Sequence, residues 1–194
     1  FAAAYPGESA DRQPVHTVYG GAHLFKADIA VKLGAAALKM VEEHAPDPGV
    51  FARALELPPI NVVATRHEPS AHGDPGTTLA DAVYDRVIEK LKREPVEDFR
   101  IDFEDGYGNR TDDEEDGHAR SAAEEMARGL AASTLPPFVG IRIKPLSAEL
   151  YRRSLRTLDL FVSGLLQASG GVLPPHFVIT LPKITSPEQV EVLV

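Results

Sequence analysis

The stretch Phe99-Arg-Ile-Asp-Phe-Glu-Asp-Gly106 indicates the fold class of this chain, because apolar and charged residues alternate along it. In a strand, side chains two positions apart share a face. A parallel strand covered by helices on both faces would be apolar almost throughout, so one face of this strand must look into a polar space. The two faces carry the apolar residues Phe99, Ile101 and Phe103 and the charged residues Arg100, Asp102 and Glu104.

Strand and helix patterns alternate along the rest of the chain. Capping residues mark three helix starts, namely Asp28, the pair Thr78 and Asp81, and the run Ser186-Pro-Glu-Gln189. We expect strands at residues 15–19, 60–65, 99–104, 139–144 and 177–181. Helices are expected at residues 29–41, 79–91, 119–130 and 150–166, with a last helix after Ser186.

This alternation is typical of α/β proteins with a parallel sheet, which is either an open doubly wound sheet or a barrel. Charges at every second position of the strands at 99–104 and 139–144 favour the (β/α)8 TIM-barrel type, which has a polar mouth. Five strand-helix units fall within residues 15–194, after a mobile leader at residues 1–14. A barrel needs about 250 residues and eight strands. We therefore expect the N-terminal part of one barrel domain, completed by further residues or by another chain.

Composition limits the classes of function. The formal net charge is -9, and no basic patch is present, so nucleic-acid binding is not expected. The chain has no cysteine, which excludes disulfides and thiolate metal sites. It also lacks an uninterrupted apolar run of about 20 residues, so it is not expected to span a membrane. A cytoplasmic protein is expected.

Polar residues gather where the predicted strands end, at the edge that carries active sites in parallel α/β folds. We expect cations there to hold a carboxylate-bearing substrate, and acids to bind metal-coordinated water or to move protons. The alternative is a structural layer of ion pairs inside a barrel. The residues at these strand ends are Arg66, Asp102, Glu104, Asp105, Arg142, Lys144 and Lys183.

Three of these strand ends resemble one known family. Ile101-Asp-Phe-Glu-Asp-Gly106 resembles the hydrophobic-Asp-Leu-Glu-Asp-Gly strand end of citrate lyase β-subunits and malyl-CoA lyases. Gly140-Ile-Arg-Ile-Lys-Pro145 is similar to their Val-Arg-Val-Asn strand, and Leu181-Pro-Lys-Ile-Thr-Ser186 to their Leu-Pro-Lys-x-Glu-Ser turn. Over residues 99–194, and less closely over 16–20, the chain resembles a divergent branch of the HpcH/HpaI aldolase and citrate lyase β-subunit superfamily.

The resemblance implies a Mg2+-dependent lyase or aldolase that makes or breaks a carbon-carbon bond in a 2-oxo acid or acyl-CoA. It implies a catalytic set of Asp102, Arg142 and Lys183, with Arg142 on the substrate carboxylate and Asp102 near the water shell of the metal. The family's own metal ligands are expected after Val194, with Asp102 or Glu104 reaching the metal through water. A homo-oligomer is expected. The substrate-binding residues would be Arg66, Glu104, Asp105 and Lys144.

Two departures from the family pattern leave other functions open. Lys144 stands in place of an Asn, and Thr185 in place of a Glu. A second hypothesis is an aldolase with Lys144 or Lys183 as a Schiff-base amine, which requires a lowered lysine pKa. A third is a non-catalytic carboxylate-binding or scaffold module.

Other motifs in the sequence match known functional patterns only in part. The run His67-Glu-Pro-Ser-Ala71 lacks the second histidine of the zinc-protease motif, although His67 and His72 remain candidates for the strand-end pocket. The acidic run at 112–116 lacks the bidentate acid of a calcium loop. We expect it to be a solvated helix start, favoured by the helix dipole. Residues 106–111 lack the third glycine of a dinucleotide-binding loop.

Overall fold

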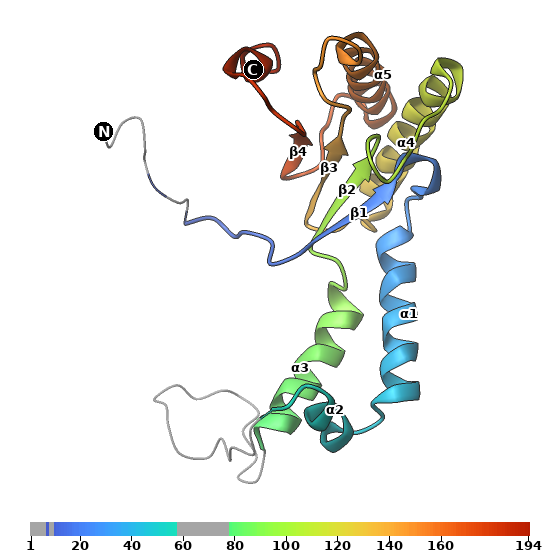
Figure 1. The fold of residues 1–194 in the computed structure, drawn as a ribbon. Coiled ribbons are helices and arrows are strands. Elements are labelled where there is room, and N and C mark those ends of the chain that lie inside the picture. Colours follow the sequence, from blue (N-terminus) through green and yellow to red (C-terminus); the bar gives the residue numbers. More distant parts are fainter. Residues whose placement is uncertain (1–6, 8–9, 58–77) are drawn as a thin grey trace.

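The computed structural model describes residues 7, 10–57 and 78–194 of the chain (Figure 1). No helix in these ranges combines the length and the apolar character needed to cross a membrane. The strands are β1 (Thr17–Gly21), β2 (Asp98–Asp102), β3 (Phe138–Arg142) and β4 (Phe177–Thr180). The helices are the 3-10 turn η1 (Ala22–Leu24) and α1 (Ile29–His44), α2 (Pro48–Ala54), α3 (Leu79–Arg93), α4 (Asp112–Ala132), α5 (Tyr151–Ser169) and α6 (Pro187–Glu191).

The four strands form one parallel sheet in the order β1-β2-β3-β4, which confirms the predicted α/β class. Parallel neighbours need crossover connections, and α4 and α5 provide them for β2-β3 and β3-β4. The register places Gly21, Asp102, Arg142 and Thr180 side by side at the carboxyl end. The strand predicted at 60–65 lies outside the described residues, and β1 pairs directly with β2.

The apolar face of the sheet packs against α4 and α5, which stand together on one side of it (Figure 1). Small residues let these two helices approach closely, since a Cβ on Gly164 would lie 3.3 Å from the Cβ of Ala123. The alternation seen in the sequence therefore separates a helix-covered face from a polar face. The core combines Phe99, Ile101, Phe103, Val139, Ile141 and Ile143 of the sheet region with Met126, Phe161 and Leu165 of the helices.

The three helices α1, α2 and α3 form an arm that extends from the amino-terminal end of the sheet (Figure 1). Both α1 and α2 contact α3. Yet no residue of α3 is buried in the described part of the chain, and the buried residues of α1 are Ala30 and Gly34. The arm therefore adds little to the hydrophobic core of the described chain.

The predicted helix caps have mixed outcomes. Thr78 and Asp81 form the predicted capping box of α3, with Asp81 N donating to Thr78 Oγ1 at 3.2 Å and Thr78 N donating to Asp81 Oδ2 at 2.9 Å. Asp28 and Ser186 occupy the predicted N-cap positions of α1 and α6, and Pro187 follows Ser186 as predicted, but neither side chain accepts a capping hydrogen bond. At α6, Gln189 Oε1 accepts a hydrogen bond from the backbone N–H of residue 185 instead.

We predict that Gly140→Ala destabilises the sheet. A Cβ at position 140 would lie 1.9 Å from the backbone oxygen of Val178 on β4, so β3 and β4 have to move apart. The expected loss is roughly 1–3 kcal/mol in the free energy of unfolding, measured in urea. Gly117→Ala on the exposed side of α4 is the control, because its Cβ meets no atom within 4 Å. It should stabilise the protein by roughly 0.5–1 kcal/mol, and equal effects of the two variants would contradict the packing described here.

Candidate functional site

Asp102 and Arg142 face each other across β2 and β3 at the point where both strands end. Arg142 Nε donates to Asp102 Oδ1 at 2.8 Å, and Arg142 Nη2 donates to Asp102 Oδ2 at 2.5 Å. The Asp102 side chain is fully buried, whereas 19% of the Arg142 side chain is exposed. A bidentate pair fixes the plane of the guanidinium as well as its position. The predicted meeting of these two residues is confirmed.

The turn after β2 saturates the Asp102 carboxylate. Its Oδ1 also accepts a hydrogen bond from Glu104 N at 2.9 Å, and its Oδ2 accepts one from Gly106 N at 2.7 Å. Glycine is needed at position 106, because a Cβ there would lie 2.6 Å from Asp102 Oδ2. Each carboxylate oxygen thus accepts two hydrogen bonds, which leaves no free lone pair for a metal ion. In this geometry Asp102 orients Arg142.

The charge of the pair is stable at neutral pH. Burial is the largest single influence on the pKa of Asp102 and would raise it. The hydrogen bonds from Arg142, Glu104 N and Gly106 N together outweigh burial, so the pKa of Asp102 is lowered. The hydrogen bond to Asp102 in turn raises the pKa of Arg142.

Lys183, in the turn after β4, adds a second cation to this edge. Its Nζ pairs with Glu104 Oε1 and donates to Asp105 Oδ1 at 3.0 Å. These contacts raise the pKa of Lys183, with the hydrogen bond to Glu104 as the largest cause. The five residues Asp102, Glu104, Asp105, Arg142 and Lys183 therefore meet, and we call them the strand-end cluster.

The second oxygen of Glu104 is the open position of the strand-end cluster. Glu104 Oε2 is buried and has no hydrogen-bond partner among the described residues, while Arg142 Nη1 lies 3.4 Å from it. A buried polar atom without a hydrogen bond carries a free-energy cost, so such atoms call for a partner. The ring of Tyr19 lies beside the guanidinium, with 4.5 Å between Arg142 Cζ and the ring centroid. A ligand that brings a hydrogen-bond donor or a cation next to Glu104 Oε2 would supply the missing partner.

Two predicted site residues are not part of this cluster. Arg66 lies outside the described residues. Lys144 was predicted to share the polar face with Arg142, and that prediction is wrong. Because β3 ends at Arg142, the alternation of faces does not continue, and Lys144 Nζ instead pairs with Glu115 Oε2 of α4 at 2.6 Å.

The acidic run at 112–116 begins α4 as predicted, but it is not solvated throughout. Glu115 and Asp116 are buried, which corrects the prediction for these two residues. Asp116 accepts hydrogen bonds from Arg156 and Arg153 of α5. The hydrogen bond with Arg156 is the largest cause that lowers the pKa of Asp116 to about 2. Sequence patterns missed this arrangement because the partners lie on another helix.

A cluster of rings near the same end of the sheet was also missed. Tyr107 Oη lies 2.7 Å from His118 Nδ1, and the ring centroid of His23 lies 5.7 Å from that of Tyr107. Burial lowers the pKa of His23 and raises that of Tyr107 to about 12. The three residues come from the turns after β1 and β2 and from α4, so no sequence spacing could have indicated their contact.

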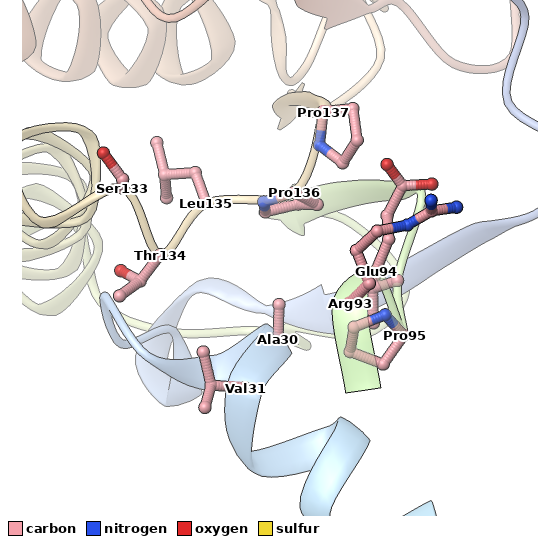
Figure 2. Close-up of a pocket in the computed structure, with 11 residues that line it drawn as sticks. Ala30, Val31, Arg93, Glu94, Pro95, Ser133, Thr134, Leu135, Pro136 and Pro137 are labelled. Carbon is pink, nitrogen blue, oxygen red and sulfur yellow. The ribbon is translucent and has the colours of Figure 1, made fainter. Parts of the chain in front are cut away.

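A cavity of about 260 Å3 lies at the opposite, amino-terminal end of the sheet (Figure 2). The segments that precede β2 and β3 and the start of α1 form its walls. No residue of the strand-end cluster lines it, so it is separate from the candidate site. Its apolar lining residues are Ala30, Val31, Pro95, Val96, Leu135, Pro136 and Pro137.

The strand-end cluster combines two cations with three acids, and one carboxylate oxygen of Glu104 has no hydrogen-bond partner among the described residues. Arg142 and Lys183 supply positive charge, and Glu104 supplies the oxygen. Within residues 10–57 and 78–194, no three His, Cys, Asp or Glu side chains are grouped so that they could hold a metal ion by themselves.

A family model described as "Domain of unknown function (DUF6986)" matches residues 1–194. No curated protein and no solved structure matches the chain.

We predict that Arg142→Ala lowers the free energy of unfolding at pH 7 by about 3 kcal/mol, because it leaves Asp102 charged and buried without its cation. In the wild type the pKa of Asp102 lies below its ordinary value of 3.8. Ionised Asp102 therefore stabilises the fold above that pH, and this contribution is lost as the pH falls through the lowered pKa. Urea unfolding should show a smaller difference between variant and wild type at about pH 3, below the ordinary pKa of Asp102, than at pH 7.

The matched control is Arg156→Ala, which also removes an arginine from a buried aspartate. Its loss should be far smaller, because Arg153 still pairs with Asp116 and the Arg156 side chain is 56% exposed. A similar loss for both arginines, with no dependence on pH, would contradict the central role of the Asp102 pair.

Proposed function

We propose a function for this chain, which belongs to the family described as a domain of unknown function (DUF6986) because the match spans residues 1–194. The proposed function is that of a Mg2+-dependent carbon-carbon lyase or aldolase. It acts on a small 2-oxo acid or an acyl-CoA. One observation carries the proposal. Asp102 locks Arg142 at the carboxyl edge of a parallel sheet, while Arg142 Nη1 stays beside the buried, open oxygen of Glu104. The strand-end motifs that resemble citrate lyase β-subunits support the choice of reaction.

In this proposal Arg142 binds the carboxylate of the substrate. Of the five N–H donors of a guanidinium, Asp102 takes the one on Nε and one on Nη2. The donors on Nη1 are not used by Asp102, and this nitrogen lies 3.4 Å from Glu104 Oε2 and 3.9 Å from Asp105 Oδ2. A preoriented guanidinium binds a carboxylate more tightly than a mobile one, because less side-chain entropy is lost on binding.

Glu104 and Lys183 act on the reacting part of the substrate. Glu104 Oε2 is able to accept a proton or a hydrogen bond, and Lys183 holds the other oxygen of the same carboxylate in place. The open oxygen also suits Mg2+, which binds carboxylate oxygens and keeps several of its waters. Glu104 is the described residue that would hold the ion. When bound, Mg2+ would supply Lewis-acid stabilisation of the negative charge that develops on an enolate oxygen.

The Schiff-base alternative finds less support. A nucleophilic lysine needs a lowered pKa, whereas the carboxylate of Glu104 raises the pKa of Lys183. Treatment with borohydride and pyruvate is therefore expected to leave the mass of the protein unchanged. A trapped adduct on Lys183 would favour the lysine route over the metal route.

We further propose that the four strands are the first part of a (β/α)8 barrel, since their consecutive parallel order and their polar inner face suit that fold. A homo-oligomer and a cytoplasmic location belong to the same proposal. The absence of cysteine is compatible with a reducing compartment.

The proposal predicts that the purified protein releases pyruvate from 2-oxo acids, or releases acyl-CoA, and that EDTA stops this activity. Arg142→Lys keeps the charge but loses the planar, bidentate geometry. We expect it to raise the KM for the substrate roughly 10-fold to 100-fold. A coupled assay for pyruvate with and without added Mg2+ measures both effects.

Arg156→Ala serves as the control, because it changes an arginine on the helix side of the sheet and should leave KM unchanged. Activity that persists in EDTA would contradict the metal-dependent reaction. Pyruvate affinity that is the same in wild type and Arg142→Ala would support a scaffold whose charges only pair with one another.

A further inference from the structure

We propose that Lys144 and Glu115 form a buried positioning pair that sets the turn carrying Asp102 and Glu104, and that Lys144 does not touch the substrate. The inference deepens the proposed function and rests on it for its ligand-binding readout. Its structural readout is independent of any ligand.

The contacts of Lys144 lead directly to the strand-end cluster. Lys144 Nζ donates to the backbone oxygen of Phe103 at 2.7 Å and to Glu115 Oε2 at 2.6 Å. Phe103 stands between Asp102 and Glu104, so its peptide group fixes the orientation of both acids. The turn at residues 104–108 is held by the same segment. In it, Glu104 O accepts hydrogen bonds from Tyr107 N at 3.1 Å and from Gly108 N at 3.2 Å.

Glu115 is held as firmly as the lysine. Its Oε1 accepts a hydrogen bond from Thr157 Oγ1 at 2.6 Å, and Arg153 Nε lies 3.5 Å from the same oxygen. The backbone oxygen of Lys144 accepts a hydrogen bond from Ser154 Oγ at 2.7 Å. The pair thus ties the end of β3 to the first turn of α4 and to the first turns of α5.

Stability alone does not explain this pair. Glu115 is 1% exposed and Lys144 is 9% exposed, so both charges have lost most of their hydration. Apolar residues of similar volume often replace a buried ion pair without loss of stability. What apolar residues cannot do is donate a hydrogen bond to the Phe103 carbonyl, and this contact acts on the geometry of Asp102 and Glu104.

The surroundings of Lys144 also argue against contact with a substrate. Its ammonium lies 5.0 Å from the ring centroid of Tyr107, which is itself buried. The lysine is therefore enclosed by protein on the α4 side of the sheet, whereas Arg142 keeps donors on the polar face.

The test is the double variant Lys144→Met with Glu115→Leu, which removes both charges and keeps the volume. Because it takes these partners from the Phe103 carbonyl and the Thr157 hydroxyl, we expect it to stay folded but to unfold at a somewhat lower temperature than the wild type. The Nε–H signal of Arg142 in 1H–15N NMR spectra should nevertheless shift and exchange faster with water, because the hydrogen bond to Asp102 is disturbed. The Kd for pyruvate should rise roughly 10-fold to 100-fold, as displacements of about 1 Å at a site commonly have effects of this size.

Glu115→Gln is the second variant, because it weakens the pair while keeping the shape of the side chain, and it should move the Arg142 signal in the same direction. Arg156→Ala is the control and should leave the signal in place. A folded double variant with the wild-type Arg142 signal and the wild-type Kd would overturn the inference but leave the proposed function standing. A shifted signal in a protein whose wild type does not bind pyruvate would support the positioning pair and overturn the proposed function.

Discussion

The bidentate ion pair between Asp102 and Arg142 joins β2 and β3 at the edge where both strands end. Asp102 is fully buried, so it is stable as a charged group only while the guanidinium and two backbone N–H groups hold it. The buried Asp102 carboxylate needs these partners. This need explains the glycine at position 106, the shape of the turn after β2 and the direction of the Arg142 side chain. The other members of the strand-end cluster take their places around this fixed cation.

The alternation within residues 99–104 and within residues 139–144 predicted the two faces of the sheet and the meeting of Asp102 with Arg142, because strand periodicity assigns each side chain to a face. The same rule failed for Lys144. The rule holds only while the backbone stays extended, and β3 ends two residues before that lysine. A sequence shows the pattern of a strand more clearly than its last residue.

The acids at the start of α4 illustrate a second limit. A run of five acidic residues suggests a solvated helix start, and its first residues are indeed exposed. Glu115 and Asp116 are buried because α5 supplies Thr157, Arg153 and Arg156 to them. Such pairing depends on how two helices pack, which the local pattern does not encode. The strand at 60–65 and Arg66 lie outside the described residues and stay predictions.

The central claim is that Arg142, oriented by Asp102, receives the carboxylate of a small substrate. A crystal structure of the protein soaked with pyruvate and Mg2+ tests it most directly. The account predicts a carboxylate within hydrogen-bond distance of Arg142 Nη1 and next to Glu104, with the Asp102 pair unchanged. Pyruvate bound only in the cavity at the amino-terminal end of the sheet, with Arg142 free of ligand, would contradict it.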